Sequence, residues 1–156
     1  MDPSSITTMI VLLVLLVIAS AFFSATETAF TSLNRVRLKA KAEAGSARAA
    51  RTLALAENYD DLISTVLVGN NIVNIVATTL STLLFVQGLR LQNGALISTV
   101  VMTVVVLIFG EVSPKSLAKE RSESFAMFAA PIMRLLMALF TPLAWLFSQW
   151  KKLLSI

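Results

Sequence analysis

The stretch MIVLLVLLVIA, residues 9–19, decides the fold class because it contains no polar side chain. It lies inside a longer uncharged run, residues 3–26, and two further uncharged runs follow at residues 62–89 and 91–110. A helix needs about 20 predominantly apolar residues to cross a bilayer. The sequence therefore predicts an all-α integral membrane protein, a single domain with three transmembrane helices. We place these spans at about residues 6–30, 61–88 and 92–117.

The composition excludes several functional classes. Of the 156 residues, 56% are hydrophobic and only 14% are charged, whereas soluble domains average about a quarter charged. The absence of cysteine and histidine removes disulfides and the ligands that zinc, copper and iron prefer, which leaves oxygen chemistry. No nucleophile–base pair is available either. We therefore expect no enzyme, and a partner that is lipid rather than nucleic acid.

The distribution of basic residues predicts the orientation. Cytoplasmic loops carry an excess of lysine and arginine. The N-terminal segment has none, and the turn between the second and third spans has only Arg90. The remaining loops hold Arg35, Arg37, Lys39, Lys41, Arg48 and Arg51 after the first span, and Lys115, Lys119 and Arg121 after the third. We expect a plasma (inner) membrane protein with its N-terminus outside and its C-terminus cytoplasmic.

Two segments outside the spans have the composition of juxtamembrane helices. Residues 35–59 are rich in alanine, leucine and charge, which favours an amphipathic helix or a helix pair with a break at Gly45–Ser46. Residues 122–152 form the second segment, and we expect both at the cytoplasmic face of the membrane.

The second segment contains an apolar part, residues 125–147, that is long enough to cross the membrane. Pro131 and Pro142 interrupt it, and Arg134 lies near its middle. A crossing would also carry the C-terminal lysines outside, against the charge distribution. We therefore expect an in-plane or re-entrant helix, and a fourth span remains the alternative.

The third span ends in FGEVSPKS, residues 109–116, where an ionisable residue and a proline meet. An ionisable residue inside a span is by default a functional hypothesis. Proline has no N–H, so Pro114 breaks the helical bonding and frees the carbonyl four residues earlier, that of Gly110. The freed carbonyl then lies beside the carboxylate of Glu111, and two such oxygens suit a cation. The alternative is a kinked helix whose glutamate reaches the lipid headgroups.

Small polar residues in the first span form a second candidate cluster. Ser20, Ser24 and Thr28 are spaced by four and therefore share one helix face, and Glu27 is the span's only charged residue. Their hydroxyls are candidate cation ligands. Close helix packing is the alternative, because small residues at this spacing commonly let membrane helices approach each other.

The second span supplies three amides within VGNNIVNIV. Asn70 and Asn74 share a face, Asn71 lies to one side, and Gly69 loosens the helix just before them. Amides in a membrane span are costly unless they have partners. One asparagine would fit an interhelical hydrogen bond, but three beside a glycine fit a polar cavity better.

The three clusters are predicted to converge in the cytoplasmic half of the membrane. Hydroxyls, amide carbonyls, a free backbone carbonyl and a carboxylate are the hard oxygen donors that Mg²⁺ or Ca²⁺ requires. The predicted metal ligands are Ser20, Ser24, Asn70, Asn74, Gly110 and Glu111. The residues expected to support them or to bind sodium are Gly69, Thr28, Glu27 and Asn71.

Three collinear motifs resemble the transmembrane domain of the CorC and cyclin-M family of magnesium transporters. They are FFSATETAFTSLNRVRL, LVGNNIVNIVATTL and FGEVSPKSLAKE, and with Ser20 they cover residues 20–120. The family's serine motif falls on Ser20 and Ser24. Its asparagine motif falls on Gly69, Asn70 and Asn74, and its glycine–glutamate–proline motif on Gly110, Glu111 and Pro114.

The resemblance implies a homodimer of three-span subunits with a belt of cytoplasmic juxtamembrane helices. It also implies Mg²⁺ export coupled to Na⁺ entry, and regulatory cystathionine-beta-synthase-type domains after the membrane part, to which nothing in this chain corresponds. Two other functions stay open at this point. A membrane anchor that only dimerises and regulates would bind no ion, and a passive divalent-cation channel would conduct Mg²⁺ whatever the sodium gradient.

Overall fold

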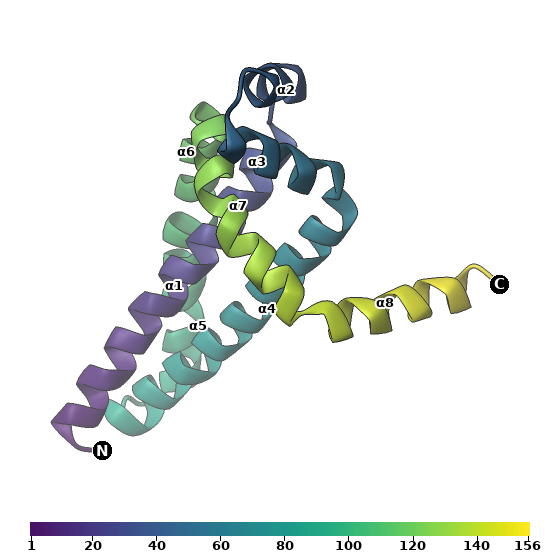
Figure 1. Ribbon diagram of the computed structural model, residues 1–156. Coiled ribbons are helices and arrows are strands. Elements are labelled where there is room, and N and C mark those ends of the chain that lie inside the picture. Colours follow the sequence, from purple (N-terminus) through teal and green to yellow (C-terminus); the bar gives the residue numbers. More distant parts are fainter. The chain divides into compact units, whose positions relative to one another are not determined.

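The computed structural model describes residues 1–156, and all its elements are helices (Figure 1). The chain, predicted as a single domain, divides into two compact units, each built from two segments that are distant in sequence. Met1–Ala25 and Gly69–Leu117 make the first unit. Thr26–Val68 and Ala118–Ile156 make the second. The candidate ligands all lie in the first unit.

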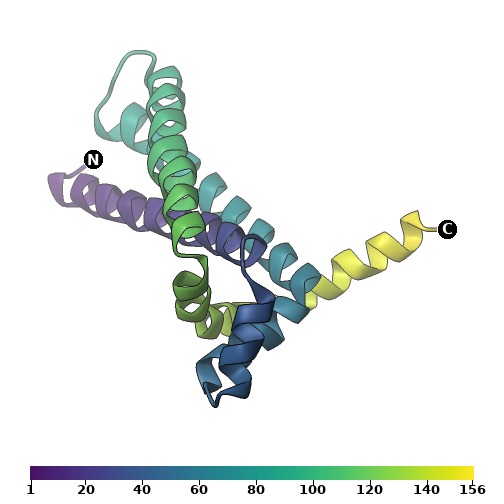
Figure 2. The ribbon, with the colours of Figure 1, turned by 90° about the horizontal axis from the view of Figure 1, so that it is seen from above.

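Three helical rods form the first unit. The first rod is the first part of α1 (Pro3–Thr31). The second is the later part of α4 (Tyr59–Leu83) with the π-helix η1 (Leu84–Gly88). The third is α5 (Gly94–Val105), η2 (Val106–Val112) and the first part of α6 (Ser113–Glu120), up to Leu117. Helices α1 and α4 run antiparallel, because Gly88 lies against Met1 and Ile6 whereas Ser20 bonds to Asn70. Figures 1 and 2 both show the N-terminus beside the turn that joins η1 to α5.

The core of the first unit lies at the end away from the candidate ligands. Its buried residues are Leu13, Ala77, Leu84 and Met102. The hydroxyls of Ser81 and Ser98, both fully buried, form a hydrogen bond of 2.6 Å between α4 and α5. Large apolar side chains are exposed along all three rods, and helices that are apolar all round are typical of membrane spans.

The second unit contains the predicted juxtamembrane helix pair, α2 (Arg35–Glu43) and α3 (Ala47–Glu57). The break falls where it was expected, because Gly45 adopts a positive φ of 107° that a residue with a side chain rarely takes. Asn34 and Ser46 cap the two helices by accepting hydrogen bonds from the backbone N–H three residues later.

Helix α7 (Ser122–Leu139) packs against α3 in the second unit. Ala126, Ala130 and Met133 are fully buried on its inner face. The carboxylate of Glu123 joins the start of α7 to α2, because it pairs with Arg37 at 3.3 Å and with Lys41.

The segment predicted at residues 122–152 is two helices rather than one. Helix α7 ends at Leu139, and α8 (Thr141–Leu154) follows, with Pro142 in its first turn where a missing N–H is tolerated. Pro131, expected to interrupt the segment, lies inside α7 without breaking it. Helix α8 buries none of its residues and extends away from α7 (Figure 1).

Four helical segments are long and apolar enough to cross a membrane, one more than the three spans predicted. They are Pro3–Thr31, Tyr59–Gly88, Gly94–Glu120 and Ser122–Leu139. The first three match the predicted spans to within three residues. The fourth is α7, which reaches 18 residues because Pro131 does not interrupt it.

Candidate cation site

The stretch FGEV lies in a π-helical segment rather than in a simple helix break. At its end the N–H of Ser113 bonds to the carbonyl of Ile108, five residues back instead of four. Pro114 cannot donate to the carbonyl five residues before it, Phe109, or to the one four before it, Gly110. The chain stays helical through Pro114, which lies in the first turn of α6. π-helical turns are frequent at functional sites.

A chain of side-chain hydrogen bonds joins the three rods of the first unit. The hydroxyl of Ser20 on α1 donates to Oδ1 of Asn70 on α4 over 3.0 Å. The Nδ2 group of the same asparagine donates to Oε1 of Glu111 on η2 over 3.3 Å. These residues, one from each predicted cluster, are therefore brought together, and Asn70 is the link between the other two.

Two glycines allow the close approach of the rods. A Cβ atom on Gly110 would lie 3.0 Å from Oγ of Ser20, so the backbone of η2 passes directly against the hydroxyl. A Cβ atom on Gly69 would lie 2.5 Å from the ring of Phe23, which is buried and covers the glycine just before Asn70. Glycine at both positions therefore keeps the oxygens of α1, α4 and η2 within reach of one another.

Two predicted ligands present buried oxygens without a hydrogen-bond partner. Oγ of Ser24 and Oδ1 of Asn74 are both enclosed and both unpaired. They do not lie together, because α1 and α4 are antiparallel and each oxygen is one turn, about 5.4 Å, beyond the Ser20–Asn70 bond in opposite directions. The six predicted ligands are therefore spread over more than one level of the bundle.

The sequence analysis did not assign Lys115 to the cation site. Its Nζ lies 3.4 Å from Oε2 of Glu111, so the two oxygens of the carboxylate have different partners. The signal was present in the sequence: a glutamate four residues before a lysine on a helix is the favourable order for an ion pair.

Of the predicted supporting residues, Gly69 adjoins Asn70, and the other three are not part of the chain of side-chain hydrogen bonds that joins the rods. Asn71 is exposed and lies to one side of Asn70, as predicted. Glu27 and Thr28 continue the face of Ser20 and Ser24 along α1, but they belong to the second unit. Their backbone carbonyls accept hydrogen bonds from Thr31 and Ser32.

The sequence of the chain also matches a known protein family. Residues 10–155, which include every candidate ligand, match the family described as the cyclin M transmembrane N-terminal domain (CNNM). The chain belongs to this family.

Members of the cyclin M family with similar sequences occur in bacteria and plants. The chain is 36% identical over 154 residues to a UPF0053 protein of Haemophilus influenzae and 42% identical over 137 residues to the UPF0053 inner membrane protein YfjD of Escherichia coli. It is 29% identical over 145 residues to a DUF21 domain-containing protein of Arabidopsis thaliana. The alignments cover 97%, 86% and 90% of this chain but only 36%, 31% and 32% of those relatives. The chain thus spans about a third of their length.

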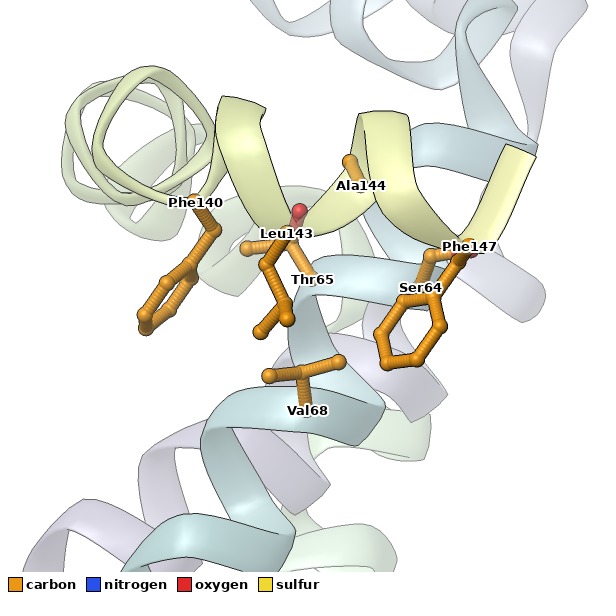
Figure 3. A pocket seen from close by; sticks show the side chains of 7 residues that line it. All are labelled: Ser64, Thr65, Val68, Phe140, Leu143, Ala144 and Phe147. Carbon is orange, nitrogen blue, oxygen red and sulfur yellow. The ribbon is translucent and has the colours of Figure 1, made fainter. Parts of the chain in front are cut away.

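A pocket in the second unit of this cyclin M domain has a different character. Helix α8 lies over the beginning of α4 there, and Figure 3 shows Leu143 above Val68. The lining residues are Ser64, Thr65, Val68, Phe140, Leu143, Ala144 and Phe147. None is charged, and the volume of about 10 Å³ is at the lower limit for one water molecule. It is a packing gap rather than a cation site.

Proposed function

We propose that this chain is the membrane part of a secondary transporter that exports Mg²⁺ from the cytoplasm, coupled to Na⁺ entry. One observation carries the proposal: Ser20, Asn70 and Glu111 place hard oxygens from three helices in one hydrogen-bonded chain. The buried hydroxyl of Ser24, one turn away, has no partner. Mg²⁺ is bound by oxygen ligands, and a carboxylate inside a span is expensive unless it serves a function.

Each ligand has a defined contribution in this proposal. Glu111 supplies the negative charge, and the Gly110 carbonyl is one that Pro114 cannot engage. Ser20 donates a hydrogen bond to Asn70 and keeps its oxygen lone pairs available, so it can bind a cation without losing that bond. The amide oxygen of Asn70 or the hydroxyl of Ser24 completes the set. The chemistry fits magnesium better than softer metals, because these ligands are all oxygens and the chain has no histidine or cysteine.

The transport cycle requires the site to open on alternate sides. We propose that Mg²⁺ enters from the cytoplasm, that the spans rearrange around Gly69, Gly110 and Pro114, and that Na⁺ occupancy drives the return. Glu27, Thr28 and Asn71 are the additional residues proposed to assist or to bind sodium.

The proposed setting follows the family and the charge distribution. It is a homodimer in the inner (plasma) membrane, with the N-terminus outside, as the loop charges favour. Three spans cross the membrane, while α2, α3, α7 and α8 lie at the cytoplasmic face. The Escherichia coli relative, YfjD, is itself named as an inner membrane protein.

Flux measurements in proteoliposomes test the function. Mg²⁺ movement should require an opposing Na⁺ gradient, and a K⁺ gradient of equal size is the matched control. Flux that is the same with either gradient would replace the exchanger with a channel. An absence of flux from folded protein that also binds no Mg²⁺ would replace it with a membrane anchor.

A further inference from the structure

We propose that the ammonium group of Lys115 is a tethered counter-cation of the site, which neutralises Glu111 when no metal is bound and competes with Mg²⁺ for the carboxylate. This inference rests on the proposed function and extends it, because it names the charge that replaces the transported ion.

The geometry of the Glu111 carboxylate supports the competition. Oε2 faces Nζ of Lys115 at 3.4 Å, and Oε1 accepts a hydrogen bond from Asn70 at 3.3 Å. Both oxygens therefore have a partner within the protein. A metal ion that binds this carboxylate comes close to both partners, and the ammonium is the one that repels it, because it is also positively charged.

The side chain of Lys115 is placed so that it can leave. It is 42% exposed whereas that of Glu111 is 26% exposed, so the ammonium lies on the open side of the pair. Its flexible stem can move the charge toward water or lipid headgroups while the backbone of α6 stays in place. A carboxylate in a membrane span is costly when it is unpaired, so the lysine returns as the metal ion departs.

The alternative is that this pair only stabilises the helix, as many glutamate–lysine pairs at this spacing do. The two explanations predict different changes in Mg²⁺ affinity when Lys115 is replaced. If the pair is only structural, loss of the lysine leaves Mg²⁺ binding unchanged or weakens it. If the lysine competes, its loss makes Mg²⁺ bind more tightly, because a repelling charge beside the ligand has gone.

Magnesium titration of the purified 156-residue chain by calorimetry tests the proposal. Lys115→Gln should lower the Kd for Mg²⁺ about tenfold, since a charge within 4–6 Å shifts the occupancy of a carboxylate by about that factor or more. Lys115→Met, a second neutral variant, should show the same tightening. Lys115→Arg retains the charge and should return the Kd toward that of the parent.

The control is Lys119→Gln, which removes a lysine one turn further along α6 and should leave the Kd within twofold of the parent, roughly the precision of such titrations. A Kd for both neutral variants equal to or weaker than that of the parent overturns the counter-cation role. If that happens while the parent still exports Mg²⁺ against sodium, only this inference falls. If the parent binds no Mg²⁺, this inference and the proposed function fall together.

Discussion

The side-chain amide of Asn70 donates a hydrogen bond to Glu111 across 3.3 Å, and this contact joins α4 to η2. The same asparagine accepts a hydrogen bond from Ser20, so one residue holds oxygens from three helices. Neither bond is short, and Asn70 is only partly buried. Under the proposed function, a cation enters this network by replacing individual contacts rather than by opening a tightly packed core.

Glu111→Gln should weaken Mg²⁺ binding by at least about tenfold, or 1.4 kcal/mol. The substitution keeps the size of the side chain and one oxygen, so the loss reports the missing charge. The matched control is Glu120→Gln, which removes the same charge at the end of α6. Calorimetric titration of both variants measures the difference. Equal binding by Glu111→Gln and the parent would make the glutamate a headgroup contact and the π-helical segment purely structural.

Ser24→Ala and Ser20→Ala should have opposite effects on stability. The hydroxyl of Ser24 is buried without a partner, so its removal should raise the free energy of unfolding by about 1 kcal/mol. The hydroxyl of Ser20 bonds to Asn70, so its removal should lower it by about the same amount. Thermal unfolding in detergent measures both.

Mg²⁺ affinity should fall less in Ser24→Ala than in Glu111→Gln, because water replaces a neutral ligand. Destabilisation by Ser24→Ala would mean that its hydroxyl does have a partner.

Pro114→Ala should weaken Mg²⁺ binding by about fivefold while it stabilises the helix. The new N–H can engage the carbonyl of Phe109 or Gly110, and one hydrogen bond is worth about 1 kcal/mol. Pro142→Ala provides the control, because Pro142 also lies in the first turn of a helix but in the other unit. Binding unchanged by Pro114→Ala would mean that the missing N–H of Pro114 contributes nothing to the Mg²⁺ affinity.

Cysteine labelling from outside intact cells should distinguish three spans from four. The chain has no cysteine of its own, so single substitutions give no background. Gln92→Cys, in the turn before α5, should react with an impermeant thiol reagent, whereas Arg48→Cys and Lys152→Cys should not. Reaction at position 152 would show that α7 crosses the membrane.

Local patterns in the sequence predicted the three long rods and the approach of Ser20, Asn70 and Glu111. Uncharged runs predicted the three long rods, and Gly45 predicted the break between α2 and α3. Glycines beside polar residues indicated that helices approach each other closely, and at Gly69 and Gly110 they do.

The positions of the polar side chains along the bundle axis, and the hydrogen-bond register within η2, could not be predicted in this way. Ser24 and Asn74 each share a face with a residue of the network, but the antiparallel run of their helices separates them. Pro131 was expected to interrupt a helix that tertiary packing of Ala126, Ala130 and Met133 maintains. The π-helical hydrogen bonding before Pro114 has no simple sequence pattern. It depends on which carbonyl accepts the hydrogen bond from the N–H of Ser113.

The π-helical segment η2 also provides a way to move the carboxylate of Glu111, the proposed ligand, without unfolding a helix. A π-turn holds one residue more than an α-turn, and one residue corresponds to a rotation of about 100° around the helix axis. If the wide turn migrates along the rod past Glu111, the carboxylate rotates away from Asn70 and toward a different side of the bundle, while α5 and α6 remain helical. Distances between spin labels on α5 and α1, with and without Mg²⁺, would stay constant in that case, and a change in them would indicate tilting of whole helices. The segment would then rotate Glu111 about the helix axis by a shift of the π-turn along a continuous helix.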